Sequence, residues 1–170
     1  ARNPVPLGFG LDAINTGNIQ LPFAIIFILF GPTSGIIISR MGSLKPIILG
    51  TIITSISFLF MLFFHTEIYY ISVALAVFAT GLSFTAIGAM NIIILFTPSN
   101  YIGTSTGLSV LIRILGSSIG PVIASLYMQF NQSHIAMNES YFYPSAYSFD
   151  LIFITATIVS MCSIALAFYL

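Results

Sequence analysis

The residue with the clearest chemical potential in this sequence is Arg113, a permanent cation inside a long apolar stretch. Its guanidinium offers five N–H donors in a planar fork, which bind a carboxylate or phosphate through two contacts. At about 100° per residue, Arg113 shares one helical face with Gly116, Ser117, Gly120 and Ala124. Small and polar residues on one face of an apolar helix predict contact with protein rather than with lipid.

The depth of Arg113 in its apolar stretch makes it a candidate for function. It lies about nine residues, or about 13 Å, inside a predicted span at residues 105–128. A charge in hydrocarbon costs at least about 2.5 kcal/mol, and intramembrane charges are functional candidates by default. We therefore expect Arg113 to be buried against another part of the protein and paired there with an acid or carbonyls. The alternative is that its long side chain reaches the headgroups.

A second polar residue, Asn91, lies at a similar depth near the end of a predicted span at residues 69–96. Its amide fits two roles that the sequence leaves open. One is a hydrogen bond to Arg113 across the two helices. The other is an interfacial or capping asparagine without a role in function.

The remaining titratable residues form no recognisable catalytic or metal-binding pattern. Two histidines lie near glutamates, but neither pair has further ligands at metal spacing. Nucleophile–base pairs, P-loops and dinucleotide fingerprints are absent from the sequence. We therefore predict no enzyme activity, no catalytic residues, no metal and no cofactor. All four acidic residues lie at or outside the ends of the predicted spans: Asp12, Glu67, Glu139 and Asp150.

The elements that position Arg113 and Asn91 are predicted to be membrane-spanning helices. The sequence is 58% hydrophobic and 5% charged, whereas soluble domains carry roughly a quarter charged residues, so lipid is the solvent that fits. The net charge of zero gives no indication of a nucleic-acid partner. A bilayer requires about 20 apolar residues per helix. Residues 1–170 therefore predict an all-α, polytopic transmembrane bundle with five spans: 19–39, 46–64, 69–96, 105–128 and 149–170.

The orientation of this bundle follows from two basic residues. Arg40 and Lys45 lie in the short loop between the first two spans, and short basic loops stay in the cytoplasm. The loop at residues 131–147 is then expected on the outer side. The chain begins at Ala1 without a methionine, which we interpret as a cut within a longer protein.

Two groups of residues stand out by their spacing. The first group is Gly31, Pro32, Gly35, Arg40 and Gly42. It resembles the cytoplasmic loop motif of the major facilitator superfamily, although Ser39 stands where the motif has aspartate. The second group is Gly107, Gly116, Gly120 and Pro121. It is similar to the family's antiporter motif, although Ala124 and Ser125 replace its final glycines.

The sequence around Arg113 resembles the penultimate helix of multidrug proton antiporters with fourteen spans. The resemblance implies the C-terminal half of a cell-membrane transporter that exports drug-like or amphipathic compounds by alternating access, coupled to protons. The missing N-terminal half, the lipid bilayer and a small-molecule substrate are the implied partners. The loop at Arg40 would latch the cytoplasmic side. The alternative is a half-size or structural membrane subunit that assembles with a separate partner half.

Overall fold

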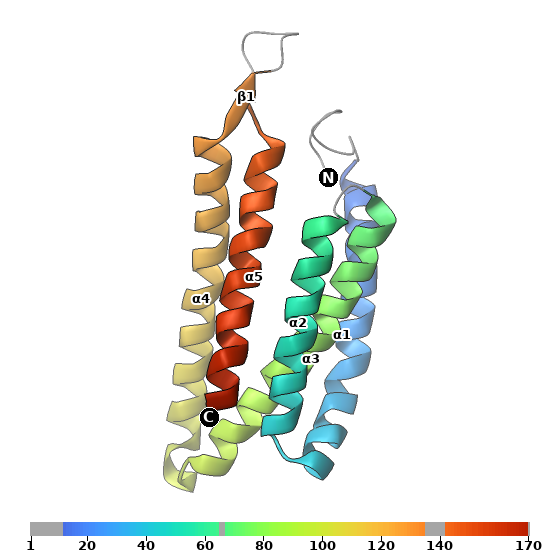
Figure 1. The fold of residues 1–170 in the computed structure, drawn as a ribbon. Coiled ribbons are helices and arrows are strands. Elements are labelled where there is room, and N and C mark those ends of the chain that lie inside the picture. The colour runs from blue at the N-terminus through green and yellow to red at the C-terminus, as the bar shows by residue number, and fades with distance from the viewer. Residues whose placement is uncertain (1–11, 65–66, 135–141, 170) are drawn as a thin grey trace.

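The computed structural model describes residues 12–64, 67–134 and 142–169, which form five long helices joined by short connections (Figure 1). A 3-10 turn, Ser99–Tyr101, leads into the fourth helix, and two short antiparallel strands, β1 (Gln132–His134) and β2 (Phe142–Pro144), connect the last two helices. The helices are α1 (Ala13–Met41), α2 (Leu44–Phe63), α3 (Ile68–Phe96), α4 (Ile102–Phe130) and α5 (Ala146–Tyr169).

All five helices are long and apolar enough to cross a membrane, so the predicted helical fold with five candidate spans is confirmed. The helices differ from the predicted spans mainly at their ends. α1 begins at Ala13 rather than near residue 19, because the Asp12 side chain caps it by accepting from the Ala13 N–H at 2.7 Å. The strands β1 and β2 were not predicted, since three residues are too few to show a strand period. Residues 1–11, Glu139 and the predicted end at residue 170 lie outside the described residues.

The helices form two groups that meet along α2 and α5 (Figure 1). One group contains α1, α2 and α3, with α3 packed against both of the others. The other is the α4–α5 hairpin. Arg40 and Lys45 lie at the end where α1 meets α2, which we call the basic end. Asp12, Glu67 and Asp150 lie at or near the opposite ends of their helices, which we call the acidic end.

Small and hydroxyl-bearing side chains fill the interior, while large apolar side chains point outward. Ser57 is buried and donates to the Ala74 carbonyl at 2.7 Å, joining α2 to α3. Ser55 on α2 and Ser160 on α5 form a buried hydroxyl–hydroxyl bond. By contrast, Phe96 is 83% exposed. This distribution suits a helix bundle in lipid, where small residues allow close approach and large apolar residues face the hydrocarbon.

The closest helix contact lies between α2 and α3 and depends on glycines. A Cβ at Gly50 would lie 2.7 Å from the Gly81 carbonyl oxygen, and a Cβ at Gly81 would lie 2.8 Å from the Thr54 nitrogen. A Cβ at Gly88 would meet the Ile47 side chain at 2.5 Å. At Gly50 and Gly81 a larger side chain therefore does not fit without moving a backbone, whereas at Gly88 the Ile47 side chain would have to move.

Candidate functional site

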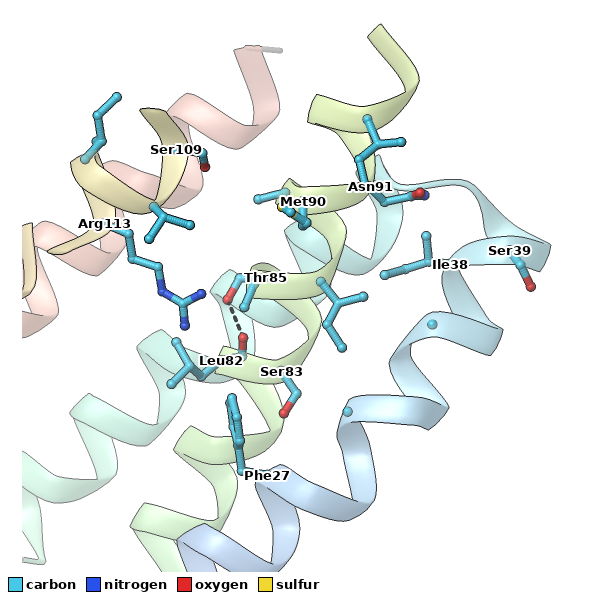
Figure 2. A pocket seen from close by; sticks show the side chains of 18 residues that line it. Phe27, Ile38, Ser39, Leu82, Ser83, Thr85, Met90, Asn91, Ser109 and Arg113 are labelled. Atoms are coloured by element: carbon cyan, nitrogen blue, oxygen red, sulfur yellow. Dashed lines mark hydrogen bonds between the residues drawn. The ribbon is translucent and has the colours of Figure 1, made fainter. Parts of the chain in front are cut away.

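A hollow of about 1050 Å³ lies between α1, α3 and α4, and Arg113 is part of its lining (Figure 2). On α1 the lining runs from Phe27, at the middle of the helix, to Ser39 near its end. On α3 it runs from Leu82, also at mid-helix, to Ile94. The hollow therefore extends from the middle of the bundle toward the basic end. We call it the arginine groove.

The Arg113 side chain projects into the arginine groove. It lies about 17 Å from the start of α4, because α4 begins at Ile102, earlier than predicted. Its guanidinium points toward Leu82 and Thr85 of α3 rather than along α4 toward the basic end (Figure 2). This direction favours a role in the groove over contact with the headgroups.

The described helices neither bury Arg113 nor pair it with another group, although the sequence led us to expect both. The side chain is exposed, and it makes no hydrogen bond or ion pair with residues 12–64, 67–134 or 142–169. A charge at this depth is costly unless water or a counter-charge compensates it. The compensation must therefore come from outside the part of the chain that the structure describes.

The hydrogen bond that the structure gives Asn91 goes to a different partner from the one proposed above. Its Nδ2 donates to the Ser43 Oγ at 2.7 Å, and Ser43 is the buried residue immediately before α2. Asn91 also lines the arginine groove, but its amide is turned away from Arg113 (Figure 2). The structure thus favours a packing role, in which Asn91 fastens α3 to the loop between α1 and α2.

In the loop motif, the structure gives Gly42 a clear structural role and leaves Arg40 exposed. Gly42 has a φ of 79° and its N–H bonds to the Ile38 carbonyl at 3.0 Å, so it ends α1 in a conformation that favours glycine. Arg40 is exposed in the last turn of α1, where a cation complements the helix dipole. Lys45 is exposed in the first turn of α2, and neither cation forms an ion pair with a described residue.

The remaining motif residues on α1 lie within the helix. Gly31 and Gly35 line the arginine groove, and a Cβ added to either would meet nothing within 4 Å among the described residues. α1 continues as a helix through Pro32. The hydroxyls of Thr33 and Ser34 donate to the carbonyls of Leu29 and Phe30 in the preceding turn.

The antiporter-like glycines of α4 also face open space. Gly116, Gly120 and Pro121 line a second hollow of about 710 Å³ between α2, α3, α4 and α5. A Cβ added at Gly107, Gly116 or Gly120 would meet no described atom within 4 Å. α4 has no buried residue. Leu82 of α3 lines both hollows, so Arg113 and the glycine face border adjoining cavities.

Two features of the site were missed from the sequence. Ser109 lies one helical turn before Arg113 and also lines the groove, at a spacing that could have been read from the sequence. Gly81 and Gly88 are seven residues apart and therefore share a face, which was the available signal for the α2–α3 seam. The glycines of the two transporter-like motifs lie elsewhere, on α1 and α4 and at the end of α1.

The described residues contain no group of three His, Cys, Asp or Glu side chains that could hold a metal ion. Cys162 is a free, exposed thiol. The chemistry that the site offers is therefore binding through a cation, hydroxyls and apolar walls. Comparisons with protein families, with curated protein sequences and with solved structures found no match for this chain.

Proposed function

We propose that this chain is one half of a secondary active transporter that moves a small solute across a membrane by alternating access. The observation that carries the proposal is the arginine groove, which holds a cation at mid-depth in a largely apolar hollow. Ionisable residues inside membranes mark substrate and ion pathways. The resemblance of the α1 and α4 motifs to the major facilitator superfamily supports the same class of protein.

The uncovered small-residue faces support the presence of a second half. Gly31 and Gly35 on α1 and Gly107, Gly116 and Gly120 on α4 leave room for another surface to approach closely. A bundle lying across α1 and α4 would cover these faces and enclose Arg113. Transporters built from repeats bind their substrate near the bilayer midplane, at the interface between the halves.

The direction of opening follows from the basic end. Arg40 and Lys45 favour a cytoplasmic position for this end, so the groove opens toward the cytoplasm. That arrangement suits the capture of drug-like or amphipathic compounds for export. Introducing cysteine by Met41→Cys, at a position that is 50% exposed at this end, tests the orientation after Cys162 is replaced by serine. A membrane-impermeant thiol reagent should not label this residue in intact cells, and strong labelling would reverse the topology.

Proton coupling would supply the energy for export. It is implied by the resemblance to proton antiporters and requires a group that gains and loses protons. The described carboxylates, Asp12, Glu67 and Asp150, lie toward the acidic end and not in the groove. The proposal therefore assigns the coupling carboxylate to the second half.

The deciding experiment is solute flux in proteoliposomes that contain the intact transporter, meaning this chain together with its second half. Flux should respond to an imposed pH gradient, and Arg113→Leu should lower it at least tenfold, equivalent to about 1.4 kcal/mol. Leu111→Ala is the matched control, because Leu111 is 59% exposed on α4 and does not line the groove. If the Arg113→Leu protein shows the same flux as the parent protein, the groove does not take part in transport.

The alternative is a half-size or structural membrane subunit that assembles with a separate partner half. The same uncovered glycine faces favour assembly without requiring transport. Purification from the native membrane separates the two functions. A stable complex that shows no solute flux under any gradient supports the structural subunit and rejects the transporter.

A further inference from the structure

We propose that the arginine groove binds a small amphipathic anion, whose oxyanion group pairs with Arg113 while its apolar body lies along α1 and α3. The inference rests on the proposed function, because it names the class of solute that the transporter moves. It differs from the sequence-based expectation, in which an acid or carbonyls of the protein were to pair with Arg113. Four features of the groove lead to the anion.

The first feature is the uncompensated charge. Among the described residues that line the groove, Arg113 is the only charged one. It forms no hydrogen bond or ion pair with a described residue. The described carboxylates, Asp12, Glu67 and Asp150, lie at or near the acidic end, away from the groove. A bound anion supplies the charge that these helices do not place near the guanidinium.

The second feature is the arrangement of donors. The guanidinium is turned into the groove, where its planar fork can bind a carboxylate, sulfonate or phosphate through two parallel contacts (Figure 2). Ser109 lies four residues earlier on the same face of α4 and lines the same groove. The hydroxyl of Ser109 donates to no described group, so it is available as a further donor to the anion.

The third feature is that the neighbouring hydroxyls on α3 already donate within their own helix and do not compete to bind the anion. The Thr85 hydroxyl donates to the carbonyls of Gly81 and Leu82 at 3.0 and 3.1 Å. The Ser83 hydroxyl donates to the Ala79 carbonyl at 2.9 Å. Because these hydrogens are used within α3, Arg113 and Ser109 remain as the donors that define the anion end of the groove.

The fourth feature is the apolar wall. Phe27, Ile38, Leu82 and Met90 line the groove from α1 and α3. Its volume of about 1050 Å³ matches the upper range of small-molecule sites, which are mostly apolar with a few placed polar groups. An inorganic ion would leave this wall uncovered, whereas an amphipathic anion covers it and places its charge at Arg113. Met90 adds a flexible surface that adapts to different apolar bodies.

The test compares two fluorescent probes that share an arylamine body. Anilinonaphthalene sulfonate carries an oxyanion, and N-phenylnaphthylamine is its uncharged counterpart. Binding is measured on the intact protein in phosphatidylcholine nanodiscs. Arg113→Gln should weaken binding of the sulfonate at least tenfold, equivalent to about 1.4 kcal/mol, and change binding of the neutral probe less than about twofold. Lys45→Gln is the charge-matched control and should change neither, because Lys45 lies outside the groove.

The possible results separate the anion site from a structural role. Unchanged sulfonate binding in the Arg113→Gln protein overturns the proposal. Equal losses for both probes also overturn it, since they indicate that Arg113 only shapes the groove. Arg113→Lys should give an intermediate loss for the sulfonate alone, because lysine keeps the charge but not the fork.

The source of the anion is distinguished by adding phosphatidylglycerol to the nanodiscs. Sulfonate binding that weakens with phosphatidylglycerol more in the parent protein than in the Arg113→Gln protein identifies the oxyanion as a lipid headgroup. An equal change in both proteins reflects repulsion at the surface and identifies the oxyanion as a free solute. Flux is measured separately. Sulfonate binding that depends on Arg113, without solute flux, supports the anion site and rejects the transport function. Solute flux without sulfonate binding that depends on Arg113 supports the transport function and rejects the anion site.

Discussion

Glycines serve opposite purposes in two regions of this molecule. Along the α2–α3 seam, Gly50 and Gly81 bring two backbones into contact, and an added Cβ would collide with backbone atoms. On α4, Gly107, Gly116 and Gly120 face open space within the described chain. The first set completes a helix contact that already exists. The second set leaves a surface on which another helix can pack.

This difference shows that a small-residue motif does not reveal where its partner lies. The motifs that resemble a transporter family mark the open surfaces of α1 and α4, while the tightly packed glycines belong to neither motif. Stability of the chain is therefore expected to depend on the α2–α3 seam. Function is expected to depend on α4 and on the arginine groove. Substitutions in the two regions should therefore affect stability and transport separately.

The largest expected effect is the loss of transport when the chain is studied alone. The 170-residue chain should insert into membranes, because its five helices are long and apolar enough to span them. On the proposed function it should show no solute flux in proteoliposomes, because alternating access requires a second half that covers the α1 and α4 faces and the groove. Flux from purified monomeric chain contradicts this. Self-association is checked by chemical crosslinking of the same samples.

The next effect concerns stability at the glycines. Gly81→Ala should destabilise the chain by about 1–3 kcal/mol, because its methyl group overpacks the seam against α2 backbone atoms. The midpoint of thermal unfolding in detergent, followed by circular dichroism, measures the change.

Gly116→Ala is the matched variant in the open region. It should leave stability unchanged or raise it by up to about 1 kcal/mol, since alanine favours a helix and meets no described atom within 4 Å. In the proposed complete transporter the same change should reduce flux, because we propose that the second half packs there. Equal destabilisation by both variants in the isolated chain would erase the distinction between the two regions.

A smaller effect is expected at the basic end. Arg40→Ala should reduce flux of the intact transporter several-fold more than Lys45→Ala, at matched expression. Arg40 occupies the arginine of the loop motif, and its fork can hold carboxylates or helix-end carbonyls of the second half. Lys45 is expected to serve as a topology anchor. Comparable flux for Arg40→Ala and the parent protein removes the latch role from Arg40.

The smallest effect is expected at Asn91. Asn91→Ala removes the hydrogen bond to Ser43 and should cost about 0.5–1.5 kcal/mol of stability. Binding of the anionic probe should remain within about twofold of the parent value, because Asn91 points away from Arg113. A tenfold loss of anionic probe binding would instead place Asn91 in the binding site.

The sequence alone was enough to predict five helices that are long and apolar enough to cross a membrane, and their positions to within several residues. Long apolar runs fix each span independently, because every backbone polar group must be satisfied within its own helix in lipid. The break at Gly42 was also readable, and the structure gives it a positive φ of 79°. The sequence further identified Arg113 as an intramembrane charge, since that follows from its place in a single apolar run.

Only the tertiary structure decided what each polar or small residue meets. Whether Asn91 bonds to Arg113 or to Ser43 depends on how α3 sits against two other segments, and periodicity along one helix carries no such information. The same holds for the glycines, because Gly81 and Gly116 look alike in sequence but face a backbone and open space, respectively. Contacts between helices distant in sequence arise from packing, and this packing placed Arg113 in the groove rather than at the headgroups.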